Sequence, residues 1–103
     1  MRRCLVLFLT IFIAAGPAGA NARLHEYALL LGSESACDLS INSRKALTWL
    51  RDGDIDVNSD AVVIELSQLV SDVDRRVKSM DAATLEWHCA TMREAIEMFD
   101  LSS

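Results

Sequence analysis

The sequence holds 103 residues with 15 acidic and 10 basic side chains, a formal net charge of −5. This acidic balance argues against nucleic acid and anionic lipid as partners, because both attract positively charged surfaces. The length suits one small domain with a modest core, a size at which a covalent cross-link adds appreciable stability.

Residues 1–20 have the pattern of a secretory signal peptide. Arg2 and Arg3 supply the positively charged start, and an apolar stretch follows over residues 5–15. The alternative is a membrane anchor, but this stretch is too short, because a helix needs about 20 apolar residues to cross a bilayer. We therefore expect a periplasmic or secreted protein that has no membrane contact once the signal is removed.

Small residues mark two possible cleavage points. Ala18-Gly19-Ala20 offers one, and a second ends at Ala22, so cleavage is expected after residue 20 or 22. The remainder, residues 21–103, is expected to form a single helical domain. Without the two arginines of the signal it carries eight basic against fifteen acidic side chains, a net charge of −7.

Three cysteines are present, and the export signal governs their interpretation. Cys4 precedes the apolar stretch and would leave with it, which excludes a lipoprotein, whose acylated cysteine follows that stretch. Cys37 and Cys89 remain, and in an oxidising compartment two cysteines allow one intramolecular pairing. A Cys37–Cys89 disulfide would close a loop worth about 4 kcal/mol in the chain-entropy model. A redox pair and a metal site are the alternatives, but the chain has no Cys-x-x-Cys and only two histidines.

The first half of the remaining chain predicts two helices. Leu24, Tyr27, Ala28 and Leu31 repeat at three and four residues, which indicates a helix over about residues 22–35, with Gly32 weakening its second half. A short second helix should begin near Asn42 or Ser43, either of which can cap a first turn. Its apolar face is Ala46, Leu47 and Leu50, and it should end over residues 51–54.

The second half predicts two longer helices. Two apolar stripes with helical spacing carry this prediction: Val62, Leu66, Leu69, Val70, Val73 and Val77 in the third helix, and Leu85, Cys89, Met92, Ile96 and Phe99 in the fourth. Ser79 and Asp81 are cap candidates between them. The expected fold is all-α, a small bundle of about four helices stapled by one disulfide, with the third and fourth helices as an antiparallel pair.

The acidic stretch over residues 54–65 has two interpretations. An EF-hand loop would take Asp54, Asp56 and Asn58 as alternating ligands, the Asp60 carbonyl at position 7 and Glu65 at position 12. Position 6, which normally requires glycine because it turns with positive φ, is instead a serine. The same letters also fit a helix cap at Asn58 or Ser59. The cap interpretation is favoured, and calcium is the alternative cofactor; otherwise no cofactor is expected.

No set of side chains predicts catalysis. His88 and Cys89 are neighbours, but on a helix consecutive residues point about 100° apart and do not face each other. The aromatic residues Tyr27, Trp49, Trp87 and Phe99, together with the methionines, are expected to pack in or beside the core. We therefore expect a protein without catalytic residues, and not an enzyme.

Two segments resemble a known group of proteins. SESACDLSINSRKALTWL (residues 33–50) and MDAATLEWHCATMREAIEMF (residues 80–99) are similar to small exported two-cysteine proteins of alphaproteobacteria, which have no established activity. The resemblance rests on a Ser-Glu-x-x-Cys-x-Leu segment before a short helix and on a His-Cys pair in the last helix. It implies a periplasmic location and a Cys37–Cys89 pairing.

These observations lead to an expected role in general terms. The chain should be an exported, non-enzymatic helical protein that binds an unknown protein partner or serves in envelope stress, as small disulfide-containing periplasmic acid-stress chaperones do. The alternative is a calcium-binding module built on residues 54–65.

Overall fold

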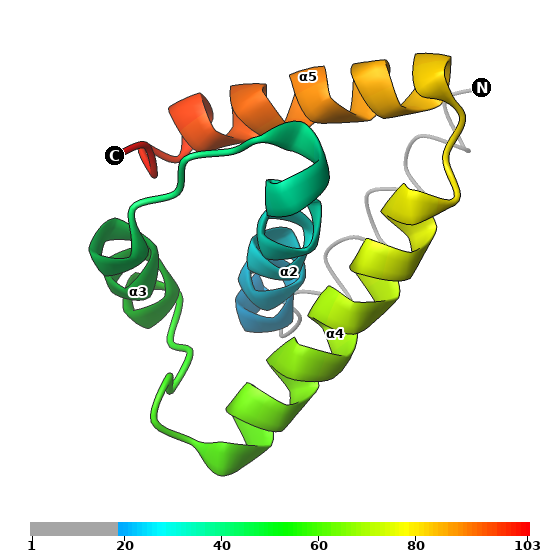
Figure 1. The fold of residues 1–103 in the computed structure, drawn as a ribbon. Coiled ribbons are helices and arrows are strands. Elements are labelled where there is room, and N and C mark those ends of the chain that lie inside the picture. The colour runs from blue at the N-terminus through cyan, green and yellow to red at the C-terminus, as the bar shows by residue number, and fades with distance from the viewer. Residues whose placement is uncertain (1–18) are drawn as a thin grey trace, which may run out of the picture.

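The computed structural model describes residues 19–103, with side chains described from residue 22 onward. Residues 1–18, and with them most of the expected signal peptide, lie outside the described part of the chain. Four helices follow one another: α2 (Gly19–Cys37), α3 (Ser43–Asp52), α4 (Asp60–Lys78) and α5 (Ala82–Met98) (Figure 1). The prediction of an all-α bundle of about four helices joined by one disulfide is confirmed.

The helix starts lie where the cap residues predicted them. The side chains of Asn42, Ser59 and Asp81 accept hydrogen bonds from backbone amides three residues further on. The sequence offers two candidate cap residues for each of these helices. The one that caps is the residue with extended backbone immediately before the first turn, because only that residue can reach those amides. Since a cap depends on residues within one turn, the sequence could predict these three starts.

The cap at Asp81 makes the stability of α5 sensitive to acid. The backbone amide of Thr84 hydrogen-bonds to the Asp81 carboxylate and lowers its pKa below the ordinary value. A carboxyl whose pKa is lower in the folded state stabilises the fold above its unfolded pKa, and this contribution is lost as the pH falls through the folded pKa. We expect Asp81→Asn, which keeps a capping oxygen, to lose less stability than the wild type below about pH 4. Thermal midpoints of both proteins between neutral pH and pH 2.5 test this, and parallel pH profiles would contradict it.

An aspartate with left-handed backbone follows α2, α3 and α5 within two residues of the helix end. Asp38, Asp54 and Asp100 have φ of 53°, 63° and 54°, in positions where helices commonly use glycine. The glycine beside one of them, Gly53, has ordinary negative φ and instead leaves room for Arg23, because a Cβ there would collide with the Arg23 side chain.

Replacing Asp54 with glycine should therefore stabilise the protein. Glycine adopts left-handed backbone without the steric penalty of a Cβ, so we expect a gain of about 0.5–1 kcal/mol in the free energy of unfolding. The matched control is Asp52→Gly, the same change in the last helical residue of α3, which should lose a similar amount. Urea denaturation measures both, and a loss in Asp54→Gly would show that its carboxylate contributes more than the backbone strain costs.

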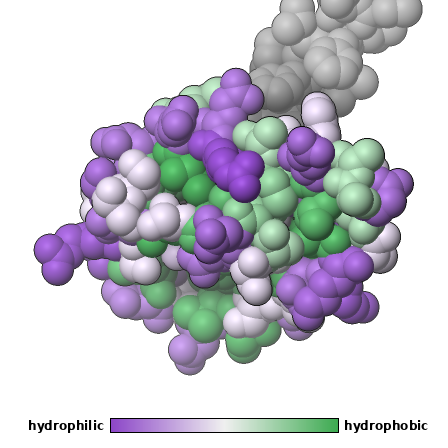
Figure 2. Space-filling model, turned by 45° about the horizontal axis from the view of Figure 1, so that its top comes forward, coloured by the Kyte–Doolittle hydropathy of each residue, from purple (hydrophilic) through white to green (hydrophobic). Residues whose placement is uncertain are grey.

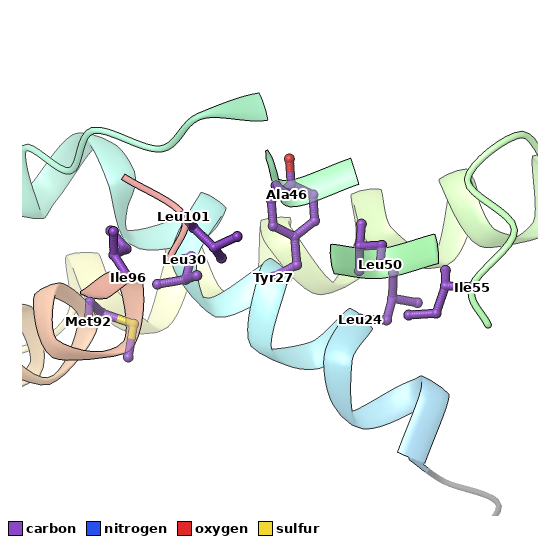
Figure 3. Close-up of a cluster of buried hydrophobic side chains, with 9 residues drawn as sticks. All are labelled: Leu24, Tyr27, Leu30, Ala46, Leu50, Ile55, Met92, Ile96 and Leu101. Carbon is purple, nitrogen blue, oxygen red and sulfur yellow. The ribbon is translucent and has the colours of Figure 1, made fainter. Parts of the chain in front are cut away.

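The core is built on α2, the central helix of the fold (Figure 1). Leu24, Tyr27 and Leu30 point from α2 toward residues of α3, α5 and the segments that follow them (Figure 3). The remaining members of this cluster are Ala46, Leu50, Ile55, Met92, Ile96 and Leu101. The apolar faces predicted for α2, α3 and α5 therefore meet, except that Leu47, which was predicted on the apolar face of α3, is exposed.

The predicted antiparallel packing of the last two helices is wrong. α4 and α5 meet at their connection and then diverge at a wide angle (Figure 1). Each packs chiefly against α2, and they make little contact with each other. The apolar stripes of α4 and α5 are both covered by α2. The short connection between α4 and α5 brings their adjoining ends together but does not require the rest of the two helices to pack against each other.

Gly32 sets how closely α2 and α4 approach. A Cβ at Gly32 would lie 2.6 Å from the Cβ of Val73 and 3.0 Å from the carbonyl oxygen of Val70, both in α4. The glycine does not end the helix, as α2 continues to Cys37, two residues beyond the predicted end. Its role is to let the two backbones come together.

The chain after α5 turns back onto the start of α3. Leu101, which is fully buried, accepts a hydrogen bond through its carbonyl from the Asn42 amide at 2.8 Å, and Ile41 forms an isolated antiparallel bridge with Ser102. This contact joins the end of the chain to the α2–α3 connection. Among the described residues, no helix is both long and apolar enough to cross a membrane.

Candidate functional site

The disulfide joins the end of α2 to the middle of α5. Cys37 is the last residue of α2, Cys89 lies on the inner face of α5, and their Cα atoms are 5.2 Å apart. Both cysteines are buried. The predicted pairing is thus formed, and its position fixes α5 across the C-terminal end of α2.

A partly buried hydrogen bond lies beside the disulfide. The hydroxyl of Ser33, which has no exposed surface, is 2.7 Å from Nε2 of His88. Ser33 precedes Cys37 by one helical turn and His88 precedes Cys89 by one residue, so the polar pair and the disulfide join the same two helices. Arg93 of α5 adds a third connection by donating to the Cys37 carbonyl at 3.2 Å. We call these five residues the polar joint.

The polar joint has the contacts of a structural element. The Ser33 hydroxyl contacts His88. Because Ser33 is shielded from solvent, a substrate could not reach this hydroxyl. The Ser33–His88 pair was not predicted from the sequence, although one signal points to it: Ser33 and Cys37 are four residues apart and share a face of α2. A buried serine on the face of the disulfide needs a partner, and α5 supplies the nearest one.

The acidic stretch forms a cap and a turn. Ser59 has extended backbone, with φ −76° and ψ 128°, and caps α4, so position 6 of the hypothetical loop lacks the positive φ of an EF-hand. The carboxylate of Asp56 accepts a hydrogen bond from the Asn58 amide at 3.0 Å.

The predicted calcium ligands are not brought together. Within the described residues, no three His, Cys, Asp or Glu side chains gather into a group that could hold a metal ion, and this includes Asp54, Asp56, Asp60 and Glu65. The geometry therefore supports the interpretation of Ser59 as a cap and gives no support to the calcium alternative.

A groove with an aromatic wall lies between α3 and the end of α5. The rings of Trp49 and Phe99 lie 4.9 Å apart at an angle of 33°. The groove encloses about 440 Å³ and is lined by Arg44, Lys45, Thr48, Trp49, Asp52, Phe99 and Asp100. We call it the aromatic groove.

Arg23 of α2 holds the aromatic wall in place. Its guanidinium carbon lies 5.2 Å from the centre of the Trp49 ring, and its Nη1 donates to the Trp49 backbone carbonyl. Trp49 is therefore fixed by a cation–π contact, a charge-assisted hydrogen bond and Phe99. The two aromatic residues were expected as packing residues, and they also form this surface.

The outward side of α5 carries two large apolar residues. Trp87 is 72% exposed and Met98 is 73% exposed, so the expectation that they pack in or beside the core is wrong. They lie opposite the buried stripe of α5, on a face with Ala83, Ala90 and Glu94 that we call the outer face of α5. Figure 2, in which the α5 side is turned toward the viewer, shows apolar residues interspersed with strongly hydrophilic ones.

No protein-family model, curated protein or solved structure matches the chain. Function must therefore be inferred from which side chains the fold exposes and how they are held. The disulfide and the Ser33–His88 pair face inward, whereas the aromatic groove and the outer face of α5 are open to solvent. These two are the candidate binding surfaces.

Proposed function

We propose that this chain is an exported, non-enzymatic protein that binds a basic amphipathic helix of a protein partner through the outer face of α5. The observation that carries the proposal is the exposure of Trp87. Tryptophan is the side chain most enriched among residues that dominate binding energies, and leaving one in water forgoes the burial of a large apolar surface. Met98 adds a flexible apolar contact on the same face.

The spacing of the two residues suits a helical partner. Trp87 and Met98 are eleven positions apart, which corresponds to about 16 Å along the α5 axis. Ala83 and Ala90 flank Trp87 with small side chains, so a second helix can lie close to the α5 backbone there. A partner helix of three to four turns could contact both anchors with apolar residues on one of its faces.

The charges of α5 favour a basic partner over a second copy of this chain. The exposed charged side chains of α5 are Glu86, Arg93, Glu94 and Glu97, three acidic and one basic. Two copies meeting through this face would bring like charges together, and the net charge of −5 adds to their repulsion. Lysine or arginine on the partner would instead find Glu94 between the two apolar anchors.

The polar joint supports this role because it makes the binding surface rigid. The disulfide and the Ser33–His88 hydrogen bond both attach α5 to α2 at its inner face, leaving the opposite face unobstructed. A surface already held in its binding conformation loses less entropy on association. The same contacts support a non-enzymatic role, since they engage Ser33, His88 and both cysteines in holding the fold together.

The location that we propose rests on the disulfide and on the sequence. A disulfide between buried cysteines is typical of proteins in oxidising compartments. Together with the pattern of residues 1–20, it favours the periplasm or the exterior of the cell.

The proposal is tested by calorimetric titration of the oxidised protein with an amphipathic Leu–Lys helical peptide. We expect saturable binding that Trp87→Ala weakens by about tenfold or more, because truncating a central anchor removes most of its contribution. Leu47→Ala is the matched control, since it truncates an exposed apolar residue on α3 and should leave binding unchanged.

A second peptide tests the charge argument. Replacing every lysine of the probe with glutamate keeps its apolar face and should abolish binding. Equal binding of both peptides, or equal effects of Trp87→Ala and Leu47→Ala, would overturn the proposal.

A further inference from the structure

We propose that the aromatic groove is a second binding site, which takes an extended peptide segment with an acidic residue at one end, an apolar residue in the middle and a basic residue at the other end. This inference goes beyond the proposed function, because it concerns a different surface and rests on different residues. Three observations carry it: a rigid aromatic wall, two charges without an ion partner, and the placement of those charges on α3.

The wall of the groove is held in position before any ligand arrives. Arg23 fixes the ring and the backbone of Trp49 from one side, and the tilted Phe99 ring contacts Trp49 from another. Both aromatic residues are half-buried, so each keeps some exposed ring surface. Such a surface can pack against an apolar side chain of a ligand with little loss of conformational freedom.

Two charges in the groove have no ion pair among the described residues. Lys45 pairs with Asp100 at 3.6 Å, whereas Arg44 and Asp52 pair with no residue of this part of the chain. Arg44, Thr48 and Asp52 succeed one another at four-residue intervals along one side of α3. The Cα atoms of Arg44 and Asp52 are therefore about 12 Å apart along the helix axis, and Trp49 and Phe99 line the same groove.

The placement of these charges does not serve the helix itself. The helix dipole favours acidic residues in the first turn and basic residues in the last. Arg51 in the last turn of α3 follows this preference, but Arg44 in the first turn and Asp52 in the last both oppose it. Residues that oppose a local preference without a compensating ion pair are typical of functional sites.

The distance between Arg44 and Asp52 along α3 indicates the length of the peptide that would contact both. In an extended peptide each residue advances by about 3.3 Å, so 12 Å corresponds to an acidic and a basic residue about four positions apart. The acidic one would meet Arg44, the basic one Asp52, and an aromatic residue midway would meet Trp49 and Phe99. A polyanion is disfavoured, because Asp52 and Asp100 also line the groove.

The test uses the Trp87→Phe variant, in which Trp49 is the single remaining tryptophan. The probe is the blocked peptide Glu-Ala-Phe-Ala-Lys, and the readout is the fluorescence of Trp49. We expect a saturable change in emission, with Arg44→Glu and Asp52→Lys each weakening the affinity about fivefold, the effect of losing one exposed ion pair. Each substitution places a charge that the helix dipole favours, so unfolding of α3 does not explain the loss.

The double variant Arg44→Glu/Asp52→Lys distinguishes binding from structural damage. It should restore the affinity, because the peptide can bind in the reverse direction when both charges are exchanged. A double variant weaker than both single variants, or no saturable signal up to millimolar peptide, would overturn the inference. An equal response to glutarate would also overturn it, since that outcome would indicate a simple anion site.

The outcomes are separable from those of the proposed function. Calorimetric titration of the wild type with the Leu–Lys peptide should give the same affinity with and without a saturating amount of the Glu-Ala-Phe-Ala-Lys peptide. If that peptide and the Glu-Ala-Phe-Ala-Lys peptide compete with each other, the aromatic groove is not a separate site.

Discussion

Replacing Cys89 with alanine is expected to lower the free energy of unfolding by about 2–4 kcal/mol. The Cys37–Cys89 bond joins residues 52 positions apart, so its loss returns a large conformational entropy to the unfolded chain. It also removes the covalent contact that holds α5 across α2. Urea denaturation of the oxidised wild type and of the variant measures the difference.

Two further variants show whether the bond itself is responsible. Cys37→Ala should cost the same as Cys89→Ala, and the double variant should cost little more than either, because all three break one bond. Ala90→Ser is the matched control, since it changes an exposed residue of α5 beside Cys89 and should be nearly neutral. A loss below about 0.5 kcal/mol in Cys89→Ala would contradict a stabilising role for the disulfide.

Replacing Gly32 with alanine should destabilise the protein, although alanine is the better helix former. In an exposed helix the change would add about 1 kcal/mol of stability. Here the new methyl group would meet Val73 at 2.6 Å and the Val70 carbonyl at 3.0 Å, so α2 and α4 must move apart. We expect a net loss of about 1–3 kcal/mol, the range for overpacked cores.

The control for Gly32→Ala lies in the same helix. Ala36→Gly reverses the substitution at an exposed position of α2 and should cost about 1 kcal/mol through helix propensity alone. Val73→Ala removes the Cγ1 atom that would lie 2.6 Å from the new methyl group, although it keeps the Cβ, so combining it with Gly32→Ala should cost less than the sum of the single losses. A Gly32→Ala variant as stable as the wild type would show that the helices can separate freely.

The sequence by itself determined the local features of this protein. The caps at Asn42, Ser59 and Asp81 involve amides three residues away, so the letters around each helix start contained the whole interaction. The apolar stripes likewise identified the buried faces, because helical periodicity depends only on residue spacing. The disulfide could be predicted by counting cysteines, because the two that lie beyond the expected signal allow only one pairing.

Only the tertiary structure decided which surfaces meet. Periodicity identifies an apolar face but not the helix that covers it, and so α4 and α5 were paired with each other although both pack on α2. The same reason explains Gly32, which looks like an interruption in the sequence and proves to be the contact point with Val73.

The candidate sites depended most strongly on tertiary structure. Ser33 and His88 are 55 residues apart and Arg23 and Trp49 are 26 apart, so no local pattern joins them. Trp87 was expected to pack because it is apolar, yet it lies opposite the predicted stripe of α5, which the disulfide at Cys89 holds against the core. Periodicity gives the side of a helix that faces inward, whereas the helices that cover that side are set by contacts distant in the sequence.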